Sequence, residues 1–314
     1  MTLSLASADM LTLIAAIPLA ALGGEAFLRG VLGVAVWLRL PKLLVATTLA
    51  AFATSSPELT VSSLAALAGK PEIGLGDALG SNVVNIGLIL GLALLFGALP
   101  VRFTEIRRDF MLALAVPVLT LALALALDGT LSRADGTLLL GLFALWLMLT
   151  ARQAIAHRRD TRTDPKSPGQ PVRAWLFVLL GLASLIVSGR LFVTGATGIA
   201  SALGIHAYVI GATVVAIGTS LPELVTTLLA RLRGHDEVGL GTLLGSNLFN
   251  GLAIVGVAAT LHPIRTPLNE IAVALGFGVL TVLLILPHRS RISRQRGLVM
   301  LAAYAAFVTA TLSV

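Results

Sequence analysis

The segment AFATSSPEL, residues 51–59, places a Thr, two Ser, a Pro and a Glu inside an otherwise apolar stretch. The pattern returns as AIGTSLPEL at residues 216–224, and GLGDALGSNVVN at 74–85 returns as GLGTLLGSNLFN at 239–250. Both pairs of segments are 165 residues apart. Chance similarity between apolar segments does not reproduce two polar motifs in one register, so the chain contains an internal repeat.

The composition around these motifs is that of a membrane protein. The 314 residues are 57% hydrophobic and 12% charged, with a mean hydropathy of +0.96, whereas soluble domains are about 25% charged. Apolar runs long enough to cross roughly 30 Å of hydrocarbon recur along the chain. We therefore expect an all-α polytopic membrane protein with ten transmembrane helices, at about 9–37, 42–69, 72–98, 108–127, 131–151, 174–203, 207–233, 237–261, 268–287 and 296–313.

The basic residues predict an orientation for these spans. When loops are assigned to alternate sides, 17 of the 22 Lys and Arg residues fall on one side and three on the other. Short cytoplasmic loops carry the excess of Lys and Arg. The richer side is therefore expected to be cytoplasmic, with the 152–173 loop inside and both termini outside. No basic residue precedes Arg29, so the first apolar segment reads as a retained helix rather than a signal peptide.

The repeat also predicts how the two halves are arranged. We expect a first repeat at 1–151, a cytoplasmic linker at 152–173 and a second repeat at 174–314. Five spans per repeat make the second half enter the membrane from the opposite side. The repeats are then inverted, which is a transporter architecture with its binding site near the bilayer midplane. Glu58 and Glu223 lie near the middle of equivalent spans, so this arrangement can bring them together.

The two carboxylates suggest a cation site. Ser55 to Glu58 and Ser220 to Glu223 have the spacing of a capping box, which predicts a break and restart of each helix. A cap alone does not explain a carboxylate at membrane depth, where ionisable residues are costly and usually functional. Broken backbone at that depth is tolerated where it is buried in protein or lines a wet cavity.

The ligand types favour a hard cation. Carboxylates, hydroxyls, Asn amides and freed carbonyls are oxygen ligands, of which Ca²⁺ takes about 6–8. The chain has no Cys and no His near the motifs, which disfavours Zn²⁺ and Cu⁺. Two negative charges match one Ca²⁺ or two to three Na⁺. Four further candidates share a helical face in pairs spaced by four residues: Ser81 with Asn85, and Ser246 with Asn250.

At these residues the chain resembles the sodium/calcium exchanger family, within the calcium/cation antiporter superfamily. The family motifs Gly-Thr-Ser-x-Pro-Glu and Gly-Ser-Asn-x-x-Asn/Asp occur in both halves. The resemblance implies ten helices in two inverted repeats. It also implies exchange of Na⁺ for Ca²⁺, typically three for one, by sliding of spans 1 and 6 past a fixed core. It implies ion coordination by Thr54, Ser55, Glu58, Thr219, Ser220 and Glu223, completed by Ser81, Asn85, Ser246, Asn250 and backbone carbonyls near Ala51 and Ala216.

Two positions depart from the family pattern, and a third bears on the coupling ion. Ala53 stands where the first motif usually has Gly, and Asp77 stands where Asn is common. Potassium-dependent relatives carry Asp at the position of Asn250, so Asn there argues against K⁺ co-transport. The resemblance thus favours an electrogenic, K⁺-independent Na⁺/Ca²⁺ antiporter in the cell membrane. The alternative on the same fold is a proton-coupled cation exchanger.

Other function classes fit less well. An intramembrane hydrolase using Ser55 or Ser220 needs a Lys or His base, and the predicted spans near these residues offer none. A channel does not need inverted repeats with matched carboxylates. We expect no enzymatic activity, no cofactor, no nucleic-acid partner and no protein partner; Ca²⁺ and Na⁺ are the expected substrates and the bilayer the environment.

Overall fold

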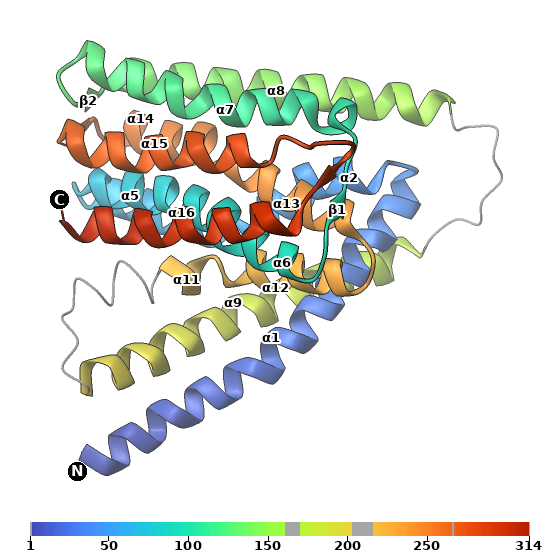
Figure 1. Cartoon of the computed structure of the whole chain (residues 1–314), viewed down its shortest axis with the longest axis horizontal. Helices are drawn as coiled ribbons and strands as arrows, with labels where there is room; N and C mark the ends of the chain where they lie inside the picture. The colour runs from blue at the N-terminus through green and yellow to red at the C-terminus, as the bar shows by residue number, and fades with distance from the viewer. Residues whose placement is uncertain (1, 161–169, 203–215, 266, 314) are drawn as a thin grey trace.

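The computed structural model describes residues 2–160, 170–202, 216–265 and 267–313, and these are mostly helical (Figure 1). The first expected span is the single helix α1, and the next two are built from short segments in which α-helix alternates with the wider π-helix. The elements up to the linker are α1 (Thr2–Leu38), α2 (Lys42–Val45), η1 (Ala46–Ala50), α3 (Ala51–Thr54), α4 (Ser56–Leu67), α5 (Pro71–Val83), η2 (Val84–Leu90), α6 (Gly91–Leu95), β1 (Leu99–Pro100), α7 (Phe103–Ala126), β2 (Thr130–Leu131) and α8 (Arg133–Asp160).

The second half repeats this segmentation. Its π-helix η4 begins at Phe249, 165 residues after the start of η2 at Val84. The described elements are α9 (Pro171–Ala202), α11 (Ala216–Thr219), α12 (Leu221–Leu232), α13 (Asp236–Leu248), η4 (Phe249–Ile254), α14 (Val255–Leu261), β3 (Ile264–Arg265), α15 (Leu268–Leu284), β4 (Arg291–Ile292) and α16 (Arg294–Ser313). Part of the expected span at 207–233 lies outside the described residues.

The linker differs from the expectation. We expected span 5 to end near residue 151, but α8 continues to Asp160. The sequence ARQAIAHRRD contains no Gly or Pro and is rich in good helix formers, so nothing in it ends the helix. The predicted 152–173 linker is therefore helical at both ends, because α9 already begins at Pro171.

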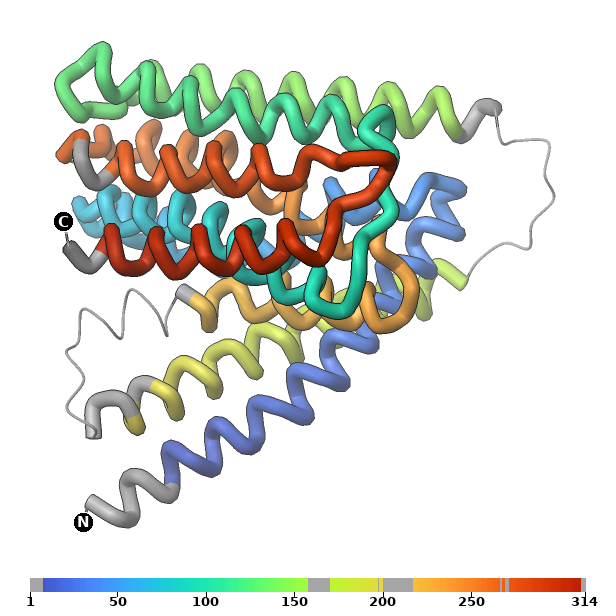
Figure 2. Tube along the Cα trace, viewed as in Figure 1, coloured from blue at the N-terminus to red at the C-terminus, as the bar shows by residue number. Residues whose placement is uncertain are grey.

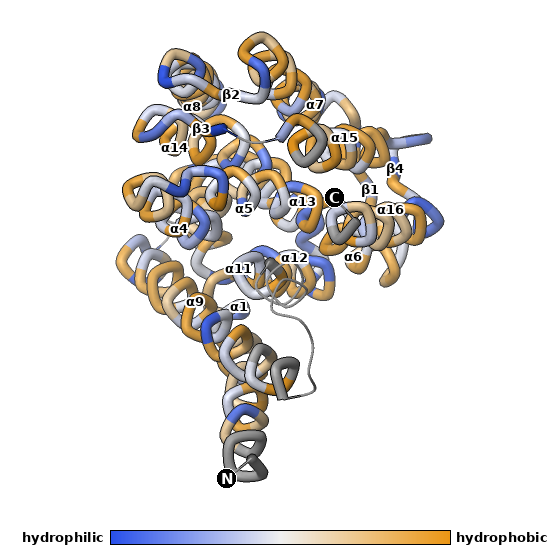
Figure 3. Tube along the Cα trace, turned by 90° about the vertical axis from the view of Figure 1, so that its left-hand side faces the viewer, coloured by the Kyte–Doolittle hydropathy of each residue, from blue (hydrophilic) through white to orange (hydrophobic). Residues whose placement is uncertain are grey.

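Six helices in the described part of the chain are long and apolar enough to cross a membrane, and two shorter apolar stretches occur at Lys42–Thr54 and Ile271–Leu284. Hydrophobic residues predominate along the helices in Figure 3, and many large ones, among them Ile17, Leu125 and Leu179, are exposed, as expected for a surface that faces lipid. The six helices are Ala8–Leu38, Pro71–Leu95, Phe103–Ala126, Arg133–His157, Pro171–Ala196 and Asp236–Leu261.

Two of these helices form the centre of the protein. In their most apolar windows, 78% of the residues of Pro71–Leu95 and 94% of those of Asp236–Leu261 are buried, against 17–39% for the other four. Both central helices carry the GSN motifs. The second polar motif of each repeat is therefore held in the best-packed part of the fold.

Helices α1 and α9 form a separate pair at one edge of the bundle, opposite α7 and α8 (Figures 1 and 2). Small residues let the two backbones approach closely. A Cβ on Gly30 of α1 would lie 2.5 Å from the backbone nitrogen of Val178, and one on Gly181 of α9 would collide with the backbone of Phe27. The side chain of Ser184 also donates a hydrogen bond to the carbonyl of Leu19 at 2.9 Å.

Two short antiparallel sheets join the halves at opposite ends of the molecule (Figure 1). Strand β1 pairs with β4, matching Leu99 to Ile292, and β2 pairs with β3, matching Leu131 to Ile264. Each sheet thus takes one strand from each half of the chain. Helix α1 begins, and helix α16 ends, at the end of the molecule that carries β2.

Candidate functional site

Each TSxPE motif interrupts a helix. Helix α3 ends at Thr54 and α4 starts at Ser56, while Ser55 between them has φ −88° and ψ 7°. Ser220 has nearly the same dihedrals, −84° and 13°, between α11 and α12. Proline at the second helical position suits such a start, since its missing N–H would have no intrahelical partner there. The predicted helix breaks are therefore present at both motifs.

The predicted capping boxes are wrong in their hydrogen bonding. Ser55 and Ser220 occupy the N-cap positions, but neither side chain caps its helix. Ser55 Oγ instead donates to Glu223 Oε1 of the other motif at 3.2 Å. A carboxylate is a stronger hydrogen-bond acceptor than a neutral group. The Ser55 hydroxyl therefore bonds to the second repeat instead of capping α4.

A hydrogen-bonded network surrounds Glu223. Its Oε1 also accepts a bond from Ser246 Oγ at 3.2 Å, and Thr54 Oγ1 lies 3.5 Å from Ser246 Oγ. All four side chains are almost fully buried. Three segments far apart in the sequence, α3 with Ser55, α12 and α13, thus converge on one carboxylate. Glu58 is 1% exposed and lies close enough to Glu223 and Asp77 to interact with both electrostatically.

The asparagines connect the two central helices. Asn82 Nδ2 donates to the Asn247 carbonyl at 3.4 Å, and Asn247 Nδ2 donates to the Asn82 carbonyl at 3.2 Å. Asn85 Nδ2 donates to Asn247 Oδ1 at 3.1 Å. Asn82 and Asn247 are equivalent in the repeat, so each residue bonds to its own counterpart. The two residues fasten α5 to α13, whereas Asn85 belongs to the adjoining π-helix η2.

Several oxygens of this region are buried and have no hydrogen-bond partner among the described residues. Buried polar groups are normally satisfied, because an unpaired one costs about 1–3 kcal/mol. A hard cation is the ligand that such a set of oxygens accepts. The unpartnered atoms include Glu58 Oε2, Glu223 Oε2, Ser81 Oγ, Ser220 Oγ, Asn85 Oδ1 and Asn250 Oδ1, together with Asp77 Oδ2.

The remaining predicted residues are distributed around this set. The Ala51 carbonyl accepts bonds from Thr54 Oγ1 at 3.3 Å and from the Ser55 amide at 3.0 Å, so an ion would share it. Thr219 ends α11 and is half-buried, and the backbone of Ala216 begins that short helix. The structure therefore brings the predicted side chains of spans 2, 3, 7 and 8 to one region.

The π-helices lie directly beside the candidate ligands. Asn85 and Asn250 are each the second residue of a π-helical segment. The wider turn changes the direction of the side chains that follow, and such segments frequently occur at functional sites. Gly80 and Gly245, the first residues of the two GSN motifs, lie inside regular helices. A Cβ on Gly245 would collide with the carbonyl of Thr47, so close approach explains that glycine.

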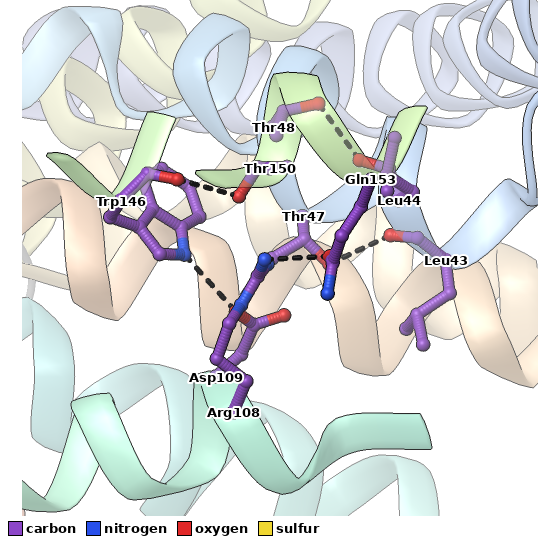
Figure 4. Close-up of polar contacts among 9 residues, drawn as sticks. All are labelled: Leu43, Leu44, Thr47, Thr48, Arg108, Asp109, Trp146, Thr150 and Gln153. Atoms are coloured by element: carbon purple, nitrogen blue, oxygen red, sulfur yellow. Dashed lines mark hydrogen bonds and ion pairs between the residues drawn. The ribbon is translucent and has the colours of Figure 1, made fainter. Parts of the chain in front are cut away.

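A second polar cluster was not anticipated from the sequence (Figure 4). Asp109 of α7 is 8% exposed, and its Oδ1 accepts bonds from Trp146 Nε1 at 3.1 Å and from Arg108 at 2.9 Å. Arg108 also bonds Gln153 of α8. The sequence signal for this cluster was an Asp just inside an apolar span. That signal did not identify its partner Trp146, which is 37 residues away. This cluster fastens α7 to α8.

The cluster lines a pocket of about 690 Å³ at the β1 end of the molecule. Four acidic residues line it, and each forms an ion pair with a basic residue: Glu105 with Arg102, Asp109 with Arg108, Asp236 with Arg231, and Glu237 with Lys42. Its charges are therefore balanced, unlike those at the paired motifs. No Lys or Arg of the described residues forms an ion pair with Glu58 or Glu223.

Comparison with known proteins gives a consistent result. The family described as sodium/calcium exchanger protein matches residues 9–151 and 173–313. The chain is 35% identical to the putative antiporter CaxA of Alkalimonas amylolytica over 294 residues, covering 89% of this chain and 91% of that protein. It is 38% identical to the inner membrane protein YrbG of Escherichia coli K12, covering 71% of each chain.

The fold matches a solved exchanger closely. The structure of the sodium-calcium exchanger NCX_Mj soaked with Na⁺ and Sr²⁺ superposes with a TM-score of 0.83 at 29% identity, covering 98% of this chain and 99% of that one. The family is one of transporters rather than of enzymes, which supports a membrane antiporter of cations. With broken helices, unpaired buried carboxylates and matches over nearly its whole length, the chain belongs to the sodium/calcium exchanger family.

Proposed function

We propose that the protein exchanges Na⁺ for Ca²⁺ at a site formed by the paired motifs. The observation that carries this proposal is the set of buried, unpartnered oxygens led by Glu58 and Glu223, which no basic residue of the described chain neutralises. A dry site with two carboxylates repels itself unless a cation compensates. The similarity of the fold to that of the sodium-calcium exchanger NCX_Mj supports the same substrates here.

We further propose ten transmembrane helices in two inverted repeats, with the linker at 152–173 between them. Two features support this arrangement: the reciprocal Asn82–Asn247 bonds between equivalent residues, and sheets that each combine strands from both halves. Self-equivalent contacts of this kind are expected at a twofold axis. The α1–α9 pair, which packs mainly against itself, is the element that slides during transport.

The ion set is proposed from the charge and from the motif. Glu58 and Glu223 supply about −2, so one Ca²⁺ neutralises the site, whereas three Na⁺ leave about +1. Asn250 in place of Asp supports K⁺ independence. Each cycle then moves one net positive charge across the membrane in the direction of Na⁺ movement. A membrane potential changes the free energy of this step by about 2.3 kcal/mol per 100 mV. That energy biases exchange roughly fiftyfold at equilibrium.

Transport by purified protein in proteoliposomes tests these statements. Ca²⁺ flux is measured with Na⁺, H⁺ or K⁺ as the sole gradient. We expect a response to Na⁺ alone; Ca²⁺ flux driven by a pH gradient without Na⁺ would instead support the proton-coupled alternative. The potential is then set from zero to −100 mV with K⁺ and valinomycin. Unchanged Na⁺-driven flux would contradict the three-for-one assignment.

A further inference from the structure

A second pocket lies beside the candidate cation site. Its volume is about 500 Å³, and it is enclosed by α4, α9, α11 and the start of α12. Pro57 and Pro222 line it, and each directly precedes one of the two candidate carboxylates. Ser56 and Thr219 contribute hydroxyl groups to its wall. The pocket therefore borders both helix breaks.

The chain direction places this pocket on one side of the carboxylates. In the proposed orientation, α4 runs outward from Glu58 through Thr60, and the chain runs inward from Thr219 to Glu223. Both Thr60 and Thr219 line the pocket, so it lies between the carboxylates and the outer surface. In this orientation a cation that exchanges with the outside passes through this space.

Arg190 of α9 is the one charged side chain among the described residues that line the pocket. It is exposed and forms no ion pair with any described residue. The equivalent position in the first repeat is Glu25, which pairs with Arg29 at 2.8 Å and with Arg233 at 2.9 Å. Equivalent positions of the two repeats thus carry opposite charges, and none of the described residues forms an ion pair with the charge on the outer side.

We propose that Arg190 is a specificity-determining residue of the outer approach, whose positive charge weakens external Ca²⁺ binding more than external Na⁺ binding. The inference rests on the proposed function. Coulomb energy is proportional to the charge of the ion. The factor by which Arg190 raises the half-saturation concentration for Ca²⁺ is therefore the square of the factor for Na⁺. A change of about threefold for Na⁺ corresponds to about ninefold for Ca²⁺.

The charge of Arg190 makes ion affinity differ between the outer and inner sides, which two identical repeats would not do. Two similar repeats make similar inner and outer sites, so differences in affinity arise where the repeats differ in sequence. Arg190 promotes release of Ca²⁺ to the outside, while Glu25 holds the corresponding inner position with its charge paired. The overall equilibrium is unaffected, since the ion gradients alone determine it.

The test compares Arg190→Gln with Arg190→Lys in liposomes of neutral phosphatidylcholine. Half-saturation concentrations for external Ca²⁺ and external Na⁺ are measured in Ca²⁺ exchange and in Na⁺-driven Ca²⁺ efflux. We expect Arg190→Gln to lower both, with the Ca²⁺ factor equal to the square of the Na⁺ factor, and Arg190→Lys to match the wild type. Arg173→Gln removes the same charge from the first turn of α9, away from the pocket, and is expected to change neither value.

The wild-type protein provides an independent readout. Raising ionic strength with choline chloride shortens the screening length from about 10 Å at 0.1 M to about 3 Å at 1 M. Screening a repulsion strengthens binding, so external Ca²⁺ affinity should rise with salt in the wild type and not in Arg190→Gln. Equal factors for both ions, or the same effect in Arg190→Lys or Arg173→Gln, would overturn the inference. A wild type without Na⁺-driven flux would overturn the proposed function as well, whereas an active wild type with an unaltered Arg190→Gln overturns this inference alone.

Discussion

Replacing Glu223 by Gln separates an ion-binding role from a structural one, because the two roles predict opposite signs. The carboxylate is 1% exposed, has no basic partner among the described residues, and leaves Oε2 without a hydrogen bond. A Gln amide oxygen can still accept the bonds from Ser55 and Ser246, and a neutral amide costs less to bury than a carboxylate. In ion-free buffer, Glu223→Gln should therefore be at least as stable as the wild type.

The Ca²⁺-dependent part of the stability should disappear in the same variant. At roughly 3 Å and an effective dielectric constant of about 20, a carboxylate attracts Ca²⁺ by about 11 kcal/mol. If desolvation leaves only about a third of that energy, the loss is ~4 kcal/mol, or about a thousandfold in affinity. At 100 times its dissociation constant, Ca²⁺ stabilises the wild type by about 2.7 kcal/mol, and the variant at that concentration by about 0.1 kcal/mol.

Thermal unfolding in detergent, with and without Ca²⁺, measures both quantities. Glu72→Gln makes the same chemical change at an exposed position at the start of α5 and should keep the full Ca²⁺ effect. Glu58→Gln should behave like Glu223→Gln, and both variants should lose Ca²⁺ transport. A Glu223 variant that is less stable without ions but retains its stabilisation by Ca²⁺ would show that the carboxylate is structural, and the reasoning would fail.

Three further outcomes are expected. Gly245→Ala should destabilise the protein by about 1–3 kcal/mol, because its methyl group overpacks the contact between α13 and η1; Gly141→Ala, with open space around it, should not. Asp109→Asn should lower the melting temperature by weakening charged hydrogen bonds worth about 1.5–3 kcal/mol, yet leave Ca²⁺ affinity unchanged; a loss of affinity would place Asp109 in the ion path. In intact cells an impermeant thiol reagent should label Asp128→Cys but not Ser290→Cys, since the chain has no other Cys; the reverse pattern would invert the proposed orientation.

The sequence predicted the positions of the helix breaks because Pro and an ionisable residue at membrane depth are strong local signals. It did not predict the partner of Ser55. A capping box is a local pattern, whereas Glu223 is 168 residues away and becomes the acceptor only through tertiary packing. The reciprocal bonds between Asn82 and Asn247 likewise join residues 165 positions apart and arise only through tertiary packing.

Hydropathy could not predict the positions of the π-helices or the end of α8, for a different reason. In the central helices nearly every side chain is buried, so hydrophobic residues occur on all faces and give no periodicity from which to detect a widened turn. At the end of α8 the chain leaves the membrane while remaining helical. Hydropathy detects the change of environment near residue 151 but carries no information on where the backbone hydrogen bonds stop.

The two carboxylates are equivalent in sequence but have different surroundings, and this difference fits the proposed mechanism. Glu223 is engaged by Ser55 and Ser246, whereas the repeat-equivalent hydroxyls of Ser220 and Ser81 have no partner among the described residues. In the proposed mechanism the α1–α9 pair slides past a fixed site, so the ligands on the other helices keep their places while access to them changes. The bonds from Ser55 and Ser246 then hold Glu223 in position, whereas Glu58, Ser220 and Ser81 keep oxygens that an ion can take. The two motifs thus present different sets of free oxygens to an ion, although their sequences nearly match.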